Sequence, residues 1–488
     1  MLFTSPVFLF AFLPITLAGF LIALRLNATR LIVPWLLAAS MIFYAWWSPA
    51  FLALLVGSTL VNWLCARAME TRARQSFERK AIFIAGLVWN LGLLAVFKYA
   101  DFFIDTVDRV TGANWALLHI ILPLGISFFT FQKIAYLADI HAGHAVAGRL
   151  MDFALFVFFF PQLIAGPIVH HAEIMPQLRK LAAGHRDGDF AEHIAVGLSL
   201  LAIGLFKKIV IADQIAPFST SVFEMAAGGK SIGLALAWQA ALAYTVQLYF
   251  DFSGYSDMAI GLARMFGVRM PANFDSPYRA TSIIDFWRRW HMTLSRFLRD
   301  YLYFPLGGNR TGPKRRYVNL MLVMLLGGLW HGAGWTYVVW GGLHGFYLFV
   351  AHLWRNSVGL AVPAIVGWAL TMLAVIVAWV FFRAPDMGSA LNVLAGMAGL
   401  HGGAAMSGEQ AQVLAKIAAL ILAAAVLPNS QQMLRAFQPV LDKVAEPSGV
   451  LARLQWRPNA GFGALTALVF LAALLFSWKS SEFLYFQF

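Results

Sequence analysis

The sequence predicts an all-α, polytopic membrane protein, and three observations support this fold class. Hydrophobic residues fill 60% of the 488 positions and charged residues only 12%, against roughly 25% charged residues in soluble globular proteins. The chain is also rich in rings, with 17 Trp and 42 Phe, which suits residues at membrane interfaces and around internal cavities. The third observation is a succession of long apolar runs separated by polar loops, which sets the expected spans.

The apolar runs are interpreted as membrane-spanning helices, because about 20 apolar residues in a helix cross a bilayer and satisfy their own backbone groups there. We expect about eleven or twelve spans and some re-entrant pieces, in a single integral-membrane domain over residues 1–488. The expected spans are Pro6–Leu24, Leu31–Trp47, Ala50–Ala66, Ala81–Phe97, Trp115–Leu137, Ala191–Ile211, Ile232–Phe250, a helix from about Tyr317, Val362–Phe382, Val413–Leu427 and Gly461–Trp478.

One strongly aromatic run, Met151–Val169, is interrupted by Pro161, Gly166 and Pro167. Such breaks at membrane depth are tolerated only where the backbone faces protein or water. We therefore expect a bent or re-entrant helix there. The other non-spanning segments expected are loops at Tyr99–Arg109, Gln177–Asp189 and Pro271–Arg279, and a short helix from Ser389 after a turn at Arg383–Pro385.

The basic loops predict the orientation of the chain. Arg25–Arg30 and Arg67–Lys80 are basic, whereas the Ser48–Pro49 turn between them carries no charge. Cytoplasmic loops are enriched in Lys and Arg, so both basic loops are expected in the cytoplasm and the N-terminus outside. The loop Pro428–Ala460 carries four basic residues and is expected in the cytoplasm; they are Arg435, Lys443, Arg453 and Arg457. The N-terminal apolar run is expected to be a retained span.

Several classes of ligand are not expected. The formal net charge of +13 does not indicate a nucleic-acid partner, because Lys and Arg gather in loops that fix the topology. The single cysteine, Cys65, cannot form an intrachain disulfide, and no C-x-x-C pattern is present, so neither a metal nor a redox site is expected. A Walker loop and a G-x-S-x-G elbow are also missing from the sequence.

The stretch Ser282–Gly345 concentrates the groups that can carry chemistry. From Arg279 to Arg316, nine basic residues and two acidic ones, Asp285 and Asp300, give a net charge of 9 − 2 = +7. Such a patch can attract an anionic cofactor to one membrane face. An apolar run containing His331 follows, and an ionisable group at membrane depth is a functional-site hypothesis by default.

His331 is expected well inside the bilayer. A helix that begins near Tyr317 would carry it ~21 Å along its axis, within a hydrocarbon core ~30 Å thick. The flanking small residues are Gly327, Gly328, Gly332 and Gly334. They suit either a helix–helix contact or a substrate chain that passes beside an imidazole acting as a general base.

His291 lies in a predicted amphipathic helix. At 100° per residue, Arg288, His291 and Ser295 share one face of that helix. The helix is either interfacial, with tryptophan anchors, or a re-entrant piece that lines a cytoplasmic funnel. We favour the second, because an aspartate and a histidine are poor headgroup anchors. The arginines that would then bind phosphates are Arg288, Arg289, Arg296 and Arg299.

Other histidines give weaker signals. His344 lies about 220° around a continuous helix from His331, so both face one cavity only if Gly341–Gly342 breaks the helix. We expect a structural role for it. His170 and His171 follow the interrupted run and could line a vestibule.

Six motifs together carry a specific resemblance. They are LPLGISFFTFQ (122–132), FPQLIAGPIV (160–169), YFDFSGYSDMAIGLARMFG (249–267), DFWRRWHMTLSRFLRDYLYFPLGGNR (285–310), LWHGAGWTYVVWGGLHG (329–345) and the terminal FLYFQF. With them the chain resembles the membrane-bound O-acyltransferase (MBOAT) family, most of all the branch of the alginate O-acetyltransferase membrane subunit.

The resemblance implies a helical fold with a central funnel or tunnel, and a catalytic centre within residues 249–345. It implies that His331 is the essential histidine and His291 the second invariant polar residue. Activity would be O-acetyl transfer from acetyl-CoA, taken from the cytoplasm across the bacterial inner membrane to an exopolysaccharide. The branch points to alginate, and acetylated cellulose or another exopolysaccharide stays open. A periplasmic or secreted acetyltransferase partner usually completes this transfer.

Alternatives stay open at this point. The acyl donor could be a carrier-protein thioester, as in the D-alanylation branch of the family. The protein could instead transport a polysaccharide or a lipid-linked sugar, although its charged groups do not occur in matching halves as in a symmetric transporter. The sequence also leaves open whether His331 activates the acceptor hydroxyl or carries the acyl group transiently.

Overall fold

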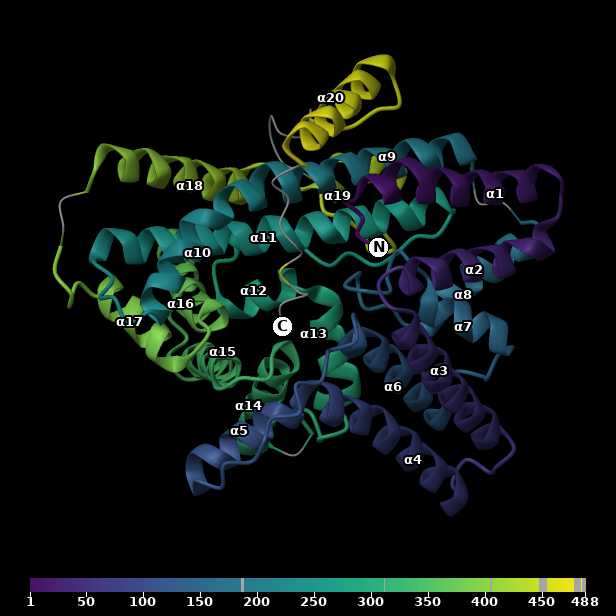
Figure 1. Ribbon diagram of the computed structural model, residues 1–488, viewed down its shortest axis with the longest axis horizontal. Helices are drawn as coiled ribbons and strands as arrows, with labels where there is room; N and C mark the ends of the chain where they lie inside the picture. Colours follow the sequence, from purple (N-terminus) through teal and green to yellow (C-terminus); the bar gives the residue numbers. More distant parts are fainter. Residues whose placement is uncertain (186–187, 311, 404–405, 447–453, 478–483, 485–488) are drawn as a thin grey trace.

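The computed structural model describes residues 1–185, 188–310, 312–403, 406–446, 454–477 and 484. Every regular element in these ranges is helical, which confirms the predicted all-α fold class (Figure 1). Arg453, Trp478 and the terminal FLYFQF motif apart from Leu484 lie outside the described residues.

The helices of the N-terminal half are α1 (Leu13–Arg25), α2 (Ile32–Ala45), α3 (Pro49–Glu70), α4 (Phe77–Leu94), α5 (Ala100–Thr111), α6 (Ile126–Ala142), α7 (Leu150–Phe158), α8 (His171–Ala182), α9 (Phe190–Leu205), α10 (Asp213–Ala227) and α11 (Leu234–Met265). Those that follow are α12 (Ile283–Arg289), α13 (Met292–Leu298), α14 (Pro313–His331), α15 (Trp335–Leu353), α16 (Ala364–Arg383), α17 (Met387–Met397), α18 (Gly408–Val426), α19 (Ser430–Met433) and α20 (Ala460–Phe476). Short π-helical segments, η3 (Ala95–Tyr99), η4 (Phe206–Ala212) and η6 (Arg299–Tyr303), extend α4, α9 and α13.

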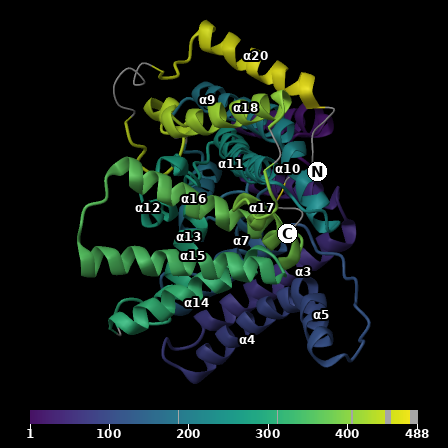
Figure 2. The ribbon, with the colours of Figure 1, turned by 90° about the vertical axis from the view of Figure 1, so that its left-hand side faces the viewer.

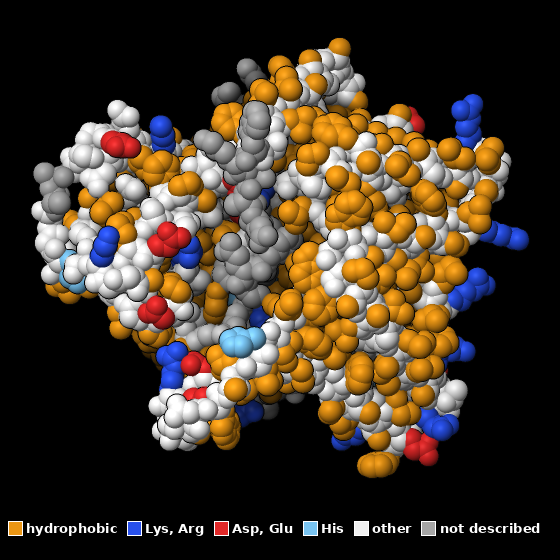
Figure 3. All heavy atoms as spheres, viewed as in Figure 1, with side chains coloured by type: hydrophobic (Ala, Val, Ile, Leu, Met, Phe, Trp, Pro, Cys, Tyr) orange, Lys and Arg blue, Asp and Glu red, His pale blue; other side chains and the backbone are white. Residues whose placement is uncertain are grey.

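Within the described residues, six helical stretches are long and apolar enough to cross a membrane, so the chain is a multi-pass membrane protein. They are Phe8–Arg25, Pro49–Glu70, Phe77–Thr111, Phe190–Ala227, Ala364–Arg383 and Gly408–Val426. The predicted span α14 is not one of them, because three basic residues, 314–316, lie in its first turn. The count of eleven or twelve crossings stays a prediction. Figure 3 shows hydrophobic side chains over much of one face, with Lys and Arg at its right-hand margin.

The long helix α11 forms the centre of the packing, and nearly all its side chains from Ala237 onward are buried. It lies beside α9 in the upper half of Figure 1. The two backbones nearly touch: a Cβ on Gly197 would lie 2.6 Å from the Gly261 carbonyl oxygen, and one on Gly204 would lie 2.5 Å from that of Gly254. Small residues allow this close contact between membrane helices.

The polar cluster after Phe250 lies inside α11, which runs beyond the end predicted for that span. Its two buried carboxylates are paired with consecutive lysines of η4: Lys207 Nζ lies 2.6 Å from Asp257 Oδ2, and Lys208 Nζ lies 2.6 Å from Asp251 Oδ1. Burial of a charge is tolerated when it is paired in this way. The helix therefore continues past Phe250, where the polar residues of the sequence led us to expect its end.

Three expectations about segments were wrong. Tyr99–Arg109 is not a loop but belongs largely to α5, which is amphipathic and has an Asp105–Arg109 ion pair one turn apart, at 2.9 Å. Trp115–Leu137 is not one span, because residues 112–125 are irregular and α6 begins only after Gly125, at φ +73°. The loop expected from Gln177 is helical to Ala182, in α8.

The interrupted run Met151–Val169 does break, but its second half is irregular backbone and not the continuation of a bent or re-entrant helix that was expected. α7 ends at Phe158, and the non-helical residues 159–169 that follow are all buried. Irregular backbone at membrane depth is therefore enclosed by protein. Gly125 packs against it, and a Cβ there would lie 3.0 Å from the Leu163 carbonyl oxygen.

Helices α14, α15 and α16 are stacked one above another in Figure 2. The contact between α14 and α15 is close, because a Cβ on Gly328 would lie 3.1 Å from Gly341 Cα. These glycines thus have the helix-contact role considered for the residues around His331. The stack brings the end of α14 toward α12 and α13.

Candidate active site

His331 is the last residue of α14, and it is buried. Gly332 and Gly334 then have extended backbone angles, with a tight turn between them in which Gly334 N donates to the Gly332 carbonyl at 3.0 Å, before α15 begins at Trp335. The helix therefore breaks here and not at Gly341–Gly342, the break considered for His344. His331 and His344 lie on different helices and contact the same ring, with centroids 5.1 and 4.8 Å from that of Trp340.

His344 has structural contacts. Its Nδ1 accepts a hydrogen bond from Trp287 Nε1 at 3.2 Å, and its ring packs on Trp340. It is absent from the residues that line the cavity beside His331. These contacts agree with the structural role expected from the sequence.

His291 is fully buried, and its ring centroid lies 6.2 Å from that of His331. The continuous amphipathic helix predicted around it is wrong, because α12 ends at Arg289 and His291 has left-handed backbone angles of φ 43° and ψ 52°. A non-glycine residue in this region costs about 1–3 kcal/mol and persists only where its surroundings fix it. The break turns His291 toward His331 and away from the face it was expected to share with Arg288.

The loop 271–279 fixes His291. Met292 N donates to the Asn273 carbonyl at 2.9 Å, and Asp275 N donates to the Arg289 carbonyl at 2.9 Å. The Asn273 Oδ1 atom lies 3.0 Å from His291 Nδ1 and 2.8 Å from Thr293 Oγ1, which donates to it. Because a carbonyl oxygen only accepts, His291 Nδ1 carries the proton in its neutral form, and Nε2 is the basic nitrogen.

Three of the four predicted arginines line one cavity of about 430 Å³. We call it the arginine cavity; its lining residues are Pro271, Ala272, Trp287, Arg288, Met292, Thr293, Ser295, Arg296, Arg299 and Asp442. Arg289 does not line it and is paired with Asp285 at 2.9 Å and Asp275 at 3.4 Å.

Two acidic residues cannot pair with the nine basic ones of this stretch, so some of these arginines are expected to be free to bind anions. Glu173 of α8 holds Arg296 through two hydrogen bonds of 2.6 and 2.9 Å. Arg299 pairs with its neighbour Asp300 at 2.7 Å. Arg288 is exposed, and among the described residues no ion pair to it is found.

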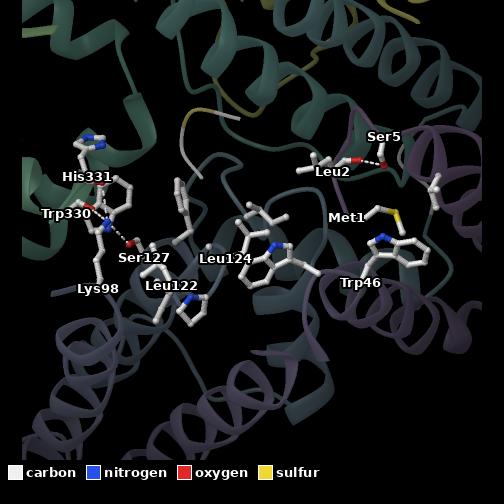
Figure 4. A pocket seen from close by; sticks show the side chains of 17 residues that line it. Met1, Leu2, Ser5, Trp46, Lys98, Leu122, Leu124, Ser127, Trp330 and His331 are labelled. Atoms are coloured by element: carbon white, nitrogen blue, oxygen red, sulfur yellow. Dashed lines mark hydrogen bonds between the residues drawn. The ribbon is translucent and has the colours of Figure 1, made fainter. Parts of the chain in front are cut away.

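A second cavity has a volume of about 520 Å³. We call it the histidine cavity, because His331 lines it together with Met1, Trp46, Trp47, Lys98, Ser127 and Trp330 (Figure 4). His291 lines neither cavity, but Thr293 lines the arginine cavity and hydrogen-bonds the Asn273 oxygen that orients His291. The histidine pair is thus connected to two cavities with different linings.

His170 lines a third cavity, of about 660 Å³, with His141 and His144, in keeping with the predicted vestibule. Its Nδ1 lies 3.1 Å from Tyr301 Oη, which donates to Asp139 Oδ1 at 2.9 Å. Burial, and then the charge of Arg296, lower the pKa of His170. Burial lowers the pKa of His171 to about 4, so neither ring carries a charge at neutral pH.

Sequence reasoning missed four residues at this site: Lys98, Glu173, Asn273 and Trp340. Only Lys98 gave a usable signal, as a lone cation at the end of an apolar run. No cluster of three metal-ligating side chains occurs in the part of the chain that the structure describes.

The buried pair of histidines, with the histidine cavity at His331 and the arginine cavity linked to His291 through Thr293, forms the candidate active site of this multi-pass membrane protein. A family model described as the membrane-bound O-acyltransferase family matches residues 147–387, which include both histidines and all four arginines. The chain belongs to this family and is an O-acyltransferase, as the motifs predicted.

Similar proteins differ in their named activity. The chain is 39% identical to a probable alginate O-acetylase of Pseudomonas putida, over 100% of both chains. It is 44% identical to the peptidoglycan O-acetyltransferase of Helicobacter pylori, over 82% of this chain and 80% of that protein. Identity to the teichoic acid D-alanyltransferase of Streptococcus thermophilus is 27%, over 48% of this chain and 58% of that protein.

Proposed function

We propose that this enzyme passes acetyl groups from cytoplasmic acetyl-CoA across the bacterial inner membrane to O-acetylate a polysaccharide. The observation that carries this proposal is a buried histidine pair in which His331 lines the tryptophan-rich histidine cavity and His291 is linked through Asn273 and Thr293 to the arginine cavity. Coenzyme A is polyanionic, so its phosphates suit guanidinium groups while the thioester reaches inward. Tryptophan rings offer apolar faces with a polar edge, which suits a carbohydrate acceptor or its carrier.

The predicted topology agrees with this assignment of sides. The arginine cavity includes Asp442, from the loop expected in the cytoplasm. The histidine cavity includes Met1 and the Trp46–Trp47 pair beside the uncharged turn, all expected outside. The donor would enter from one side and the acceptor from the other.

In the proposed reaction, His331 takes the proton of an acceptor hydroxyl as that oxygen attacks the thioester carbonyl carbon. A C–O bond forms and the C–S bond breaks. The thiolate of coenzyme A leaves and takes up the proton that His331 accepted. His291 lies close enough to His331 to help bind the reacting groups. It would do so through Nε2, which is left unprotonated because Nδ1–H donates to Asn273 Oδ1. A transient acyl-histidine would use the same residues in two steps.

The first acceptor we propose is alginate, with a periplasmic or secreted acetyltransferase partner that completes the transfer. The similarity to a peptidoglycan O-acetyltransferase favours peptidoglycan as the second candidate. The acetyl content of both polymers, compared in cells with and without the enzyme, distinguishes them. Acetylation of neither polymer would contradict both assignments.

Use of acetyl-CoA is tested on the purified protein with radiolabelled acetyl-CoA and, in parallel, an acylated carrier protein. We expect the label to be consumed only from acetyl-CoA. Consumption only from the carrier would establish the D-alanylation-like alternative. Movement of polysaccharide or lipid-linked sugar that survives loss of His331 would instead support a transporter.

The arginine cavity gives a prediction about donor affinity. Arg288→Ala and Arg296→Ala should each weaken acetyl-CoA binding by roughly 10- to 100-fold, because a charge-assisted contact contributes about 1.5–3 kcal/mol. Catalysis at saturating donor should change little, since phosphates do not react. Lysine should rescue only in part, because it lacks the guanidinium fork. Titration calorimetry on the purified variants measures this.

Arg289 supplies the matched control, because it is paired with Asp275 and Asp285 outside the cavity. Arg289→Ala should leave the dissociation constant for acetyl-CoA within about threefold of the parent value. Equal affinities for the parent, Arg288→Ala and Arg296→Ala would show that the cavity does not hold the donor.

The orientation can be tested by cysteine labelling after Cys65→Ser. Single cysteines at Ala73 and Asn309 are expected to resist a membrane-impermeant thiol reagent in intact cells and to react after permeabilisation. Asn114, exposed in the irregular segment after α5, is the control expected to react from outside. Labelling of Ala73→Cys and Asn309→Cys in intact cells would invert the proposed donor side.

A further inference from the structure

Lys98 and Tyr99 bind the end of the helix that carries His331. Lys98 Nζ donates to the carbonyl oxygens of Trp330 at 2.5 Å and His331 at 3.2 Å. It also donates to Ser127 Oγ of α6 at 3.3 Å (Figure 4). Tyr99 Oη donates to the Leu329 carbonyl at 3.0 Å. Three consecutive carbonyls of α14 are thus held by two adjacent residues from η3.

These contacts supply what a helix end requires. The last four carbonyls of an α-helix have no partner within the helix, and the negative end of the helix dipole favours a cation. α14 ends at His331, and residues 332–334, with a tight turn at Ala333, lead the chain out of the helix. An ammonium group has three hydrogens, and three protein acceptors lie around Lys98 Nζ. Lys98 therefore holds the end of α14 at the edge of the histidine cavity, which it also lines.

We propose that Lys98, assisted by Tyr99, is a positioning residue that fixes the end of α14 and with it the His331 imidazole in the histidine cavity. The inference rests on the proposed function of His331. Lys98 lies 233 positions from His331 in the sequence, so the contact also connects the segment of α4, η3 and α5 to α14. Misplacement of a reacting group by about 1 Å can lower a rate by about 100-fold.

The functional test compares Lys98, which is half-buried, with Lys133, which is buried. Lys98→Met keeps the length of the side chain but removes its charge and donors, and we expect kcat to fall about 30- to 100-fold with unchanged acetyl-CoA affinity. Lys98→Arg should recover part of the rate, and Tyr99→Phe should lower it about two- to fivefold, because one hydrogen bond is lost. These two milder variants keep the test valid if Lys98→Met does not fold.

Lys133→Met is the matched control. Lys133 is buried away from the helix end, and its Nζ donates to Ser58 Oγ at 2.9 Å and lies 4.4 Å from the Phe129 ring centre. If kcat falls equally for Lys133→Met and Lys98→Met, Lys98 has only a general structural role and the proposal fails. A parent-like kcat for Lys98→Met would overturn the proposal outright.

A second measurement does not depend on catalysis. His331→Cys in a Cys65→Ser background reports the position of the helix end through its rate of labelling by a small thiol reagent. The parent side chain at 331 is only 4% exposed. Adding Lys98→Met should raise the labelling rate about tenfold, and adding Lys133→Met should not. An unchanged rate contradicts the capping role. Faster labelling, combined with a parent enzyme (His331 intact) that transfers no acetyl, overturns only the proposed function.

Discussion

His331→Ala is expected to lower acetyl transfer by about 10²- to 10⁴-fold, the range for loss of a general acid or base. The imidazole lies at the end of α14, lines the histidine cavity and is within one ring contact of His291. Expression and membrane insertion should be unchanged, because one side of the His331 ring already faces the open space of the histidine cavity. The measurement is acetyl content of the polymer per amount of membrane-inserted enzyme.

The control uses the other histidine that packs on Trp340. His344→Asn keeps an acceptor for Trp287 Nε1, so it should retain most of the activity, whereas His331→Asn should be as inactive as His331→Ala. Equal losses for the two asparagine variants would mean that the region fails by unfolding. Normal acetylation with His331→Ala would remove His331 from the mechanism.

The fold class followed from composition, because a chain with few charges and long apolar runs has no alternative to membrane helices. The ends of the helices were harder to predict. Glycine permits both a helix break and a close helix contact, and the sequence around His331 contains several. Only the packing shows that Gly328 and Gly341 make the contact, while the residues after His331 form the break.

His291 and His331 were chosen from the sequence as candidate site residues, and the structure places their ring centroids 6.2 Å apart. It does so through a left-handed turn at His291 that helical periodicity could not anticipate. The partner of Arg296 is Glu173, 123 positions away, so counting charges within the local stretch could not find this pair. Lys98 and Asn273 act through contacts between distant segments, for which a single sequence carries no pairing information.

The second large effect expected is at His291. His291→Ala should lower kcat by about 10²- to 10³-fold, because its Nε2 is the basic nitrogen of a ring fixed beside His331. Asn273 sets that state, since its Oδ1 accepts from Nδ1–H. Asn273→Leu keeps the side-chain shape but removes the acceptor, and kcat should fall about 10- to 100-fold.

A double-mutant cycle separates this role from general stability. If Asn273 acts through His291, Asn273→Leu should have almost no further effect on kcat in the His291→Ala background, because residues that act as a unit are strongly non-additive. Thr293→Val is the control, since it removes the other donor to Asn273 Oδ1 and leaves the contact to His291 intact; kcat should fall less than about fivefold. Equal effects of Asn273→Leu in the parent and the His291→Ala enzyme would refute the assignment of the proton to Nδ1. The same Asn273 oxygen contacts both Thr293, which lines the arginine cavity, and His291. If Asn273→Leu has no further effect in the His291→Ala enzyme, Asn273 therefore also links the proposed donor cavity to the histidine pair.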